Sequence, residues 1–500
     1  SRDGKAVLKS ASQMATDRAL IKSAIKLVET QEMAPERAIW EAATSFADQM
    51  AALGGYMAER VTDIHDVRAR IVAELTDQQA PGIPVSDEPF ILAAIDLAPA
   101  DTATLDPEKV IALITSDGGP QAHTAILARG LGLPAIVAAK GVTDIADGTI
   151  VYVESNEGIV DTEPTDADRE AAIKYANRKP VADFDGQGVL ADGTRVELYA
   201  NVGDGKSAEK AASLKAEGVG LLRTEFGFLG HDSEPSIETQ AKTYKSVFDA
   251  FPGKHIVVRT LDAGADKPLP FLNVNPEENP ALGVRGFRTD WTVPGVLTRQ
   301  LEAIKAASEN SDADIWVMAP MISTTSEARN FANMLKEIGL PVHGVMVETP
   351  AAVMNAEAIL GEVDFVSIGT NDLTQYTMAA DRLLGDLAHL NNPWQPAVLK
   401  MIKMTVEGAQ RASVTAGKKK YVSVCGEAAA DPALAVVLIG LGVDTLSMNA
   451  GAIPAVAAVL KSVTKEKAQQ IAAIALQQIS SAEAKESARK ALPILDELGL

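Results

Sequence analysis

One histidine of this sequence, His123, stands where a side chain could receive an anionic group. It follows the glycine pair Gly118 and Gly119 and directly precedes a segment with helical spacing, in the run GGPQAHTAILARG. Glycines let a ligand approach the backbone closely, and the first turn of a helix offers free N–H groups to an anion. A lone histidine before a helix more often caps or packs, so these residues alone leave both interpretations open.

A second set of chemically capable side chains lies at the ends of seven of the eight apolar runs found between residues 197 and 450. Arginine matches phosphate and carboxylate geometry, whereas a carboxylate pair such as Glu348 and Asp372 would suit Mg²⁺, which takes few ligands from protein. The set as a whole predicts a small, doubly anionic ligand. Its members are Asn201, Arg223, Glu225, Arg259, Asp262, Glu348, Asn371, Asp372, Cys425, Glu427 and Asn449.

Several of these side chains also have a purely structural interpretation. Arg223 could pair with Glu225, and Glu348 and Asp372 could be ordinary partners of the arginines. Arg259 lies at an equivalent depth on the next predicted strand. Because two neighbouring arginines repel each other unless an anion lies between them, this placement favours a shared ligand.

Three residues, one of them already in this set, carry weaker signals. Arg285 and Arg288, in the run GVRGFR, are expected in loop ion pairs, with contact to a phosphate as the second interpretation. Cys425 is the only cysteine. A free cysteine is usually a small buried hydrophobe, but its place at a strand end among cations that would tune its pKa makes a catalytic thiol the alternative.

The elements that must position these residues alternate regularly. Helical segments follow each of the apolar runs ELYANV, GLLRTEF, IVVRTLD, IWVMAPM, GVMVET, FVSIGTND, VSVCGE and TLSMNA. Strands that alternate with helices predict a parallel sheet, and eight such units predict a (β/α)8 TIM barrel over residues 189–500. Catalytic side chains of such barrels lie at the carboxyl ends of the strands.

Three segments precede the barrel. Apolar residues at helical spacing between Met14 and Leu75 predict a small helical bundle, to which we assign residues 1–85, and Pro35 marks the start of one helix. Short β-rich runs predict a compact α/β domain over residues 86–163. The polar residues 164–188 are expected to form a linker helix.

Composition excludes several classes of protein. A chain of 500 residues that is 47% hydrophobic should form two or three domains. A net charge of -21 argues against a nucleic-acid partner. No apolar run approaches the roughly 20 residues of a membrane helix, so we expect no membrane contact. The single cysteine fits a reducing compartment, and we therefore expect a cytoplasmic protein.

Taken together, the motifs resemble those of the Enzyme I family of the phosphoenolpyruvate-dependent sugar phosphotransferase system, the phosphoenolpyruvate-protein phosphotransferases. Any one motif alone would leave the related dikinases open, but the likeness covers essentially the whole chain. The motifs are GGPQAHTAILARGLGLPAIV, GVGLLRTEF, VVRTLDAGADKPLP, ENPALGVRGFR, VMVETPAA, IGTNDLTQYTMAADR and VCGEAAADP.

This resemblance implies a phosphohistidine swivelling α/β domain with an inserted helical bundle, followed by the barrel. It implies that phosphoenolpyruvate phosphorylates His123, that Cys425 is the general acid, and that Glu348 and Asp372 hold Mg²⁺. The helical domain would dock the phosphocarrier protein HPr, which receives the phosphoryl group as the first step of sugar uptake, and the barrel would form a homodimer. The residues expected to bind phosphoenolpyruvate are Arg223, Arg259, Arg285, Asn371, Asp372 and Arg382.

Two other functions compete with this one. A phosphoenolpyruvate synthase or pyruvate phosphate dikinase would need a further nucleotide-binding domain, for which the sequence offers no glycine-rich loop and no spare length. A regulatory homologue without catalysis is disfavoured because the histidine, the arginines, the carboxylates and the thiol are all present together.

Overall fold

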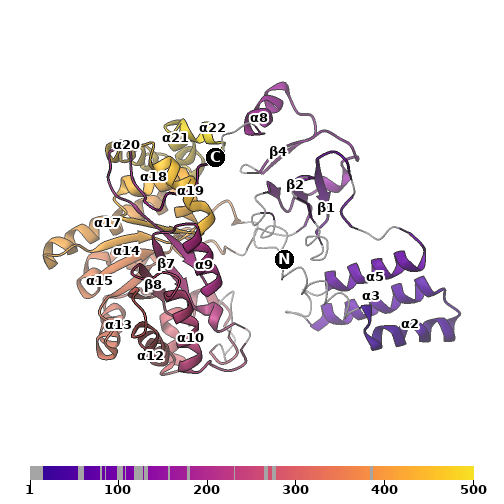
Figure 1. Ribbon diagram of the computed structural model, residues 1–500, viewed down its shortest axis with the longest axis horizontal. Coiled ribbons are helices and arrows are strands. Elements are labelled where there is room, and N and C mark those ends of the chain that lie inside the picture. The colour runs from indigo at the N-terminus through magenta and orange to yellow at the C-terminus, as the bar shows by residue number, and fades with distance from the viewer. Residues whose placement is uncertain are drawn as a thin grey trace. The chain divides into compact units, whose positions relative to one another are not determined.

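The structure is a computed structural model that forms two compact units, Ser1–Ala176 and Asn177–Leu500 (Figure 1). The residues described are 15–53, 61–78, 82–84, 86–97, 105–106, 109–117, 128, 133–155, 158–176, 181–229, 231–263, 269–272, 277–382, 384 and 387–500.

Helices open the described part of the first unit, where the apolar spacing predicts a bundle. They are α2 (Arg18–Gln31), α3 (Pro35–Leu53) and α5 (Val61–Leu75). The carboxylate of Asp17 caps α2 by accepting the N–H groups of Ala19 and Leu20 at 2.8 and 3.0 Å. Pro35 begins α3, where its missing N–H leaves no helical hydrogen bond unmade. The apolar faces of the three helices pack into one small core.

A parallel sheet in the order β1-β2-β3 follows the helices, and an antiparallel pair, β4 and β5, comes after it. Four of these strands lie within the β-rich runs of the sequence. The bounds are β1 (Phe90–Ala94), β2 (Val110–Thr115), β3 (Ala135–Ile136), β4 (Tyr152–Glu154) and β5 (Ile159–Asp161), and helix α8 (Asp166–Ala176) ends the unit. His123 and the helix predicted directly after it lie outside the described residues.

The described part of the second unit contains the predicted (β/α)8 barrel, so the expected fold class is confirmed. Eight parallel strands close in the order β10-β11-β12-β13-β6-β7-β8-β9, and each predicted apolar run overlaps one of them. The strands are β6 (Glu197–Val202), β7 (Gly218–Arg223), β8 (His255–Arg259), β9 (Asp314–Ala319), β10 (His343–Val347), β11 (Phe365–Ile368), β12 (Tyr421–Val424) and β13 (Thr445–Met448).

Helices surround the strands in Figure 1, and most of the apolar core lies between the two layers. Side chains that accept backbone N–H groups fix several helix starts, such as Thr324 at α13 and Thr349 at α14. The helices are α9 (Gly205–Ser213), α10 (Ile237–Phe248), α11 (Thr289–Thr292), α12 (Val296–Ser308), α13 (Thr325–Ile338), α14 (Pro350–Met354), α15 (Ala356–Glu362), α16 (Thr370–Met378), α17 (Pro396–Ala416), α18 (Pro432–Leu441), α19 (Ile453–Leu460), α20 (Lys465–Leu476), α21 (Ser481–Lys490) and α22 (Ile494–Leu498).

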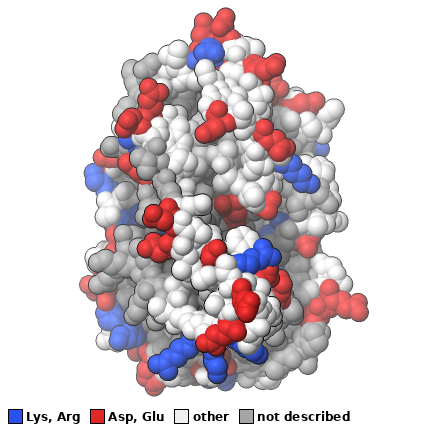
Figure 2. Space-filling view, turned by 90° about the vertical axis from the view of Figure 1, so that its right-hand side faces the viewer, with Lys and Arg blue, Asp and Glu red and all other residues white. Residues whose placement is uncertain are grey.

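The surface reflects the acidic composition. On the face drawn in Figure 2, acidic side chains are spread over the surface, and lysines and arginines are interspersed among them. Among the described helices, none is long and apolar enough to cross a membrane.

Candidate functional site

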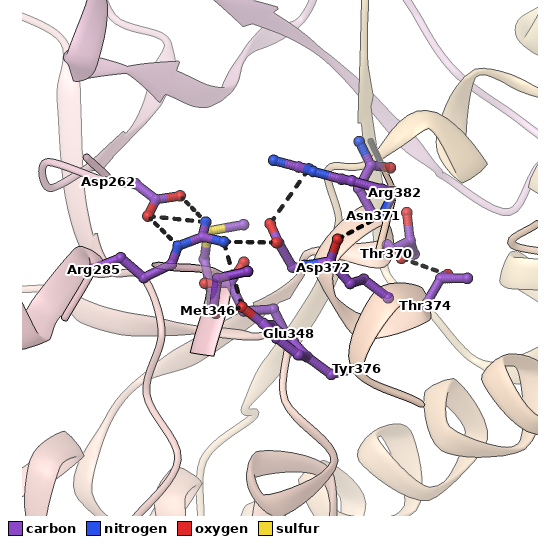
Figure 3. Close-up of polar contacts among 12 residues, drawn as sticks. Asp262, Arg285, Met346, Glu348, Thr370, Asn371, Asp372, Thr374, Tyr376 and Arg382 are labelled. Atoms are coloured by element: carbon purple, nitrogen blue, oxygen red, sulfur yellow. Dashed lines mark hydrogen bonds and ion pairs between the residues drawn. The ribbon is translucent and has the colours of Figure 1, made fainter. Parts of the chain in front are cut away.

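Six charged side chains form a row of ion pairs at the carboxyl ends of the barrel strands. Acidic and basic members alternate, and the charged atoms of successive members lie 2.9 to 3.7 Å apart. Figure 3 shows the row from Asp262 onward. We call this set the ion-pair row, and its members in order are Glu225, Arg259, Asp262, Arg285, Asp372 and Arg382.

The barrel strands position the start of the row. Arg259 is the last residue of β8, and Asp262 follows it by three residues. Glu225 lies in the short 3-10 turn Thr224–Gly227 that comes directly after β7. The Arg259 guanidinium contacts Glu225 at 2.9 Å and Asp262 at 3.0 Å. Because Arg259 is 7% exposed and Glu225 only 1%, this pairing keeps both charges compensated inside the protein.

Arg285 occupies the centre of the row. Its Nη2 contacts both carboxylate oxygens of Asp262, at 3.0 and 3.1 Å, and its Nη1 donates to Asp372 Oδ1 at 2.9 Å. The Tyr376 hydroxyl, which the sequence analysis did not identify, lies 3.5 Å from the same Nη1. Arg285 therefore forms the ion pairs expected of it. The expectation for Arg288 is wrong within the described residues, because its guanidinium donates to a backbone carbonyl and a serine hydroxyl instead of a carboxylate.

Arg223 lies outside the ion-pair row. It ends β7 in register with Arg259, as the sequence predicts, but Glu225 pairs with Arg259 and not with Arg223. Glu225 and Asp262 already compensate the charge of Arg259, so repulsion between the two arginines does not by itself require an anion between them. Among the described residues, the half-buried Arg223 side chain makes no hydrogen bond or ion pair. Arg223 is therefore a cation available to an external anion.

Glu348 directly follows β10 and is 1% exposed. Its Oε1 accepts the Met321 N–H at 2.6 Å, whereas its Oε2 has no hydrogen-bond partner in the part of the chain that the structure describes. Burial, and then the nearby carboxylates of Asp372 and Asp262, raise the pKa of Glu348 to about 8. The site thus holds a buried carboxyl group with one oxygen left open.

Glu348 and Asp372 are chemically suited to a divalent cation. Mg²⁺ prefers hard carboxylate oxygens and takes its other ligands from water and substrate, and Glu348 offers an oxygen without a hydrogen bond. Within the described ranges, no group of three or more His, Cys, Asp and Glu side chains is arranged to hold a metal ion. The fit therefore rests on this pair alone, next to Arg259 and Arg285 of the row.

Cys425 comes directly after β12 and is 2% exposed. Its Sγ donates to the Ile368 carbonyl at 3.7 Å. Burial raises the pKa of the Cys425 thiol, and the Ser367 hydroxyl and the charge of Arg259 offset only part of that effect. At neutral pH the thiol therefore keeps its proton, which makes it a potential proton donor and not a nucleophile.

The remaining predicted residues lie nearby. Asn371 is in the first turn of α16, and its Oδ1 accepts the Glu427 N–H at 3.4 Å. The Arg382 side chain is 28% exposed, and its Nη1 lies 3.7 Å from Asp372. The structure thus gathers all the predicted barrel residues at one end of the barrel, while His123 lies outside the described residues.

A buried hydrogen-bond network behind the site was missed by the sequence analysis. Gln300 on α12 accepts the Leu261 N–H at 2.8 Å and donates to the Thr224 and Tyr244 hydroxyls, both at 3.0 Å. Thr224 in turn donates to the Arg259 carbonyl at 2.9 Å. This network fixes the backbone from the Arg259 carbonyl to the Leu261 N–H. The one signal available in the sequence was a polar residue within the buried helix stripe Val296, Leu297, Leu301 and Ile304.

Family models of known proteins match three successive parts of the chain. The family model described as the PEP-binding domain of PEP-utilising enzymes matches residues 181–465. The models described as the mobile domain and the N-terminal domain of the same enzymes match residues 86–158 and 1–60.

Two relatives of known name align with this chain over most of its length and of their own. The phosphoenolpyruvate-protein phosphotransferase of Streptomyces coelicolor is 45% identical over 494 residues, which are 98% of this chain and 88% of that protein. The protein of the same name from Haloferax volcanii is 39% identical over 466 residues, 90% and 81% of the two chains. A solution structure of Enzyme I is 30% identical, covers 34% of this chain and 69% of its own, and gives a TM-score of 0.29.

Proposed function

Since the chain belongs to the phosphoenolpyruvate-protein phosphotransferases, the Enzyme I family of PEP-utilising enzymes, we propose that the carboxyl ends of its barrel strands bind phosphoenolpyruvate. One observation carries this proposal. Arg223 has no ion pair among the described residues, although it lies beside the ion-pair row. A buried or half-buried cation without a partner is costly, and an anionic substrate would compensate it.

Phosphoenolpyruvate carries a phosphate and a carboxylate, and the site offers cations for both. Arg223 supplies an unpaired charge, while Arg259 and Arg382 can exchange part of their contacts to carboxylates of the row for contacts to the ligand. Asn371 adds an uncharged donor at the start of α16. Preorganised donors of this kind stabilise the charge that develops on a phosphoryl group in flight.

We further propose that Glu348 and Asp372 hold Mg²⁺. Two observations support this role. Among the described residues, Glu348 Oε2 has no hydrogen-bond partner, and the carboxylates of Asp372 and Asp262 lie close to Glu348. The ion would help neutralise the phosphate and the enolate oxygen of the substrate. Arg285 orients Asp372 by holding its Oδ1 at 2.9 Å.

In the proposed reaction the neutral imidazole of His123 attacks phosphorus, and the bond from phosphorus to the bridging oxygen breaks with its electron pair on oxygen. The enolate then takes a proton at C3 from the Cys425 thiol and becomes pyruvate, and water reprotonates the thiolate. The raised pKa of Cys425 supports this role, because the thiol remains protonated until the enolate forms. His123 then passes the phosphoryl group to a histidine of HPr, with the helical bundle as the docking domain.

Labelled phosphoenolpyruvate tests this function most directly. The full chain should acquire acid-labile label in the presence of Mg²⁺, and HPr should remove it. Arg223→Ala should raise the KM for phosphoenolpyruvate at least 10-fold through the loss of a charged contact, roughly 1.5–3 kcal/mol. Arg329→Ala is the matched control, since Arg329 pairs with Glu362 on the barrel exterior. An Arg223→Ala enzyme with an unchanged KM would move the binding site elsewhere.

We also propose a cytoplasmic homodimer that forms through the barrel. The single cysteine is a free buried thiol, which fits a reducing compartment. Sedimentation of the full chain at micromolar concentration should give twice the mass of one chain. A monomer at that concentration would contradict the dimer.

A further inference from the structure

The backbone of Cys425, directly after β12, is held in place by a side chain from β6. The Asn201 side-chain amide, at the end of β6, donates from Nδ2 to the Cys425 carbonyl at 2.9 Å. This bond joins residues that are 224 positions apart in the sequence. The bond thus links β6 to the main chain of Cys425 and not to its sulfur.

Asn201 is itself oriented by a second residue. The Ser447 hydroxyl on β13 donates to Asn201 Oδ1 at 2.5 Å, and Ser447 is 1% exposed. An amide whose oxygen accepts a hydrogen bond must present its NH2 group to the other side, where the Cys425 carbonyl lies. Gly220 on β7 leaves room for this arrangement, because a side-chain carbon there would lie 2.5 Å from the Ser447 hydroxyl oxygen.

The β11 side holds the same short segment. The Cys425 N–H donates to the Ile368 carbonyl at 3.2 Å, and its Sγ donates to the same oxygen. The next residue, Gly426, packs so closely on Thr370 that a side-chain carbon there would lie 1.9 Å from the hydroxyl oxygen. With β11 on one side and Asn201 on the other, the thiol residue has its peptide N–H and C=O groups both fixed.

We propose that Asn201, oriented by Ser447, is a positioning residue that aims the Cys425 thiol at C3 of the enolate. This inference rests on the proposed role of Cys425 as the acid. A general acid works only within hydrogen-bond reach of the atom it protonates, and an error of about 1 Å can cost roughly 100-fold in rate. Asn201 and Ser447 would thus control the protonation of carbon, whereas the arginines control binding and phosphoryl transfer.

The handedness of protonation tests the proposal, because a fixed thiol protonates one face of the enolate. Phosphoenolpyruvate with deuterium at one C3 position, converted in tritiated water, should give pyruvate with a chiral methyl group of one hand. Asn201→Asp places a carboxylate against the Cys425 carbonyl, and Ser447→Ala frees the amide. Both variants should give largely racemic methyl groups and form pyruvate roughly 10- to 100-fold more slowly, while the KM for phosphoenolpyruvate changes less than about 2-fold.

The milder Ser447→Ala variant keeps the test informative if Asn201→Asp fails to fold. Ser423→Ala is the matched control, since its hydroxyl on β12 contacts the Val366 carbonyl at 3.5 Å and not Asn201. It should behave as wild type. Wild-type handedness and rate in both test variants would overturn the role of Asn201. Cys425→Ala separates the two hypotheses: if it also retains one hand, the proposed acid is wrong, and if it alone gives racemic product, only the positioning role fails.

Discussion

Replacement of Glu348 by glutamine should change the pH dependence of stability in a way that the site geometry defines. Burial and the carboxylates of Asp372 and Asp262 raise the pKa of Glu348 from 4.5 to about 8. Between these two pH values the folded chain keeps a proton that the unfolded chain has released. The free energy of unfolding therefore falls as pH rises from about 4.5 to about 8, and the stability lost over that window does not return at higher pH.

The size of the effect follows from the same shift. At 1.36 kcal/mol per pH unit, the change from 4.5 to about 8 corresponds to roughly 5 kcal/mol. Glutamine keeps an oxygen for the Met321 N–H but buries an NH2 group where Oε2 has no hydrogen-bond partner, at a cost of about 1–3 kcal/mol. Glu348→Gln should therefore be more stable than wild type by about 2–4 kcal/mol above pH 8, and less stable by about 1–3 kcal/mol below pH 5.

Calorimetry of the full chain at pH 5 and pH 9, with a chelator present, measures whether the order of stability of wild type and Glu348→Gln reverses between these pH values. For a unit of this length the barrel transition of Glu348→Gln should lie roughly 3–6 °C above that of wild type at pH 9 and below it at pH 5. Glu362→Gln is the control, because its carboxylate pairs with Arg329 at the surface and should contribute less than about 1 kcal/mol at either pH. Parallel pH profiles for wild type and Glu348→Gln would refute the reasoning.

The other predictions concern the proposed reaction. His123→Ala should abolish the transfer of label from phosphoenolpyruvate to the chain yet leave the binding of the ligand to the barrel intact, and label on this variant would place the acceptor elsewhere. Asp372→Ala should remove turnover together with its Mg²⁺ dependence, so unchanged activation by Mg²⁺ would show that the ion binds at another position. Cys425→Ser should slow pyruvate formation roughly 100-fold, because a hydroxyl is far less acidic than a thiol. Deuterium exchange from D₂O into the pyruvate methyl group at the wild-type rate would show that Cys425 only packs.

The barrel could be predicted from the sequence because each strand is an apolar run followed by a helical period. Such a long, regular alternation admits few other folds. The positions of the site residues followed from the same argument, since parallel strands bring their carboxyl ends together. Arg223 and Arg259 were expected at equivalent depths, and the strand register places them opposite each other.

The pairing within the site could not be predicted in the same way. Arg223 and Glu225 are two residues apart, and an extended strand would put them on one face, but the 3-10 turn Thr224–Gly227 directs Glu225 to Arg259. The N–H group that Glu348 accepts comes from Met321, whose φ of 58° lies in the left-handed region that side chains with a Cβ rarely adopt. Local sequence carries no signal for either feature, because both depend on contacts between distant segments.

The bonds from Ser447 to Asn201 and from Asn201 to Cys425 also constrain the order in which activity can arise during synthesis. The first bond joins β6 and β13, the first and the last strands of the barrel in sequence, and Ser447 follows Asn201 by 246 residues. The second bond joins β6 to the residue directly after β12. A nascent chain emerges from the ribosome amino end first. Almost the whole barrel must therefore be synthesised before β13 is available to pair with β6. Because Asn201 is oriented only once Ser447 on β13 is in place, we expect an unfinished chain to lack the fixed Cys425 thiol and to be unable to form pyruvate efficiently.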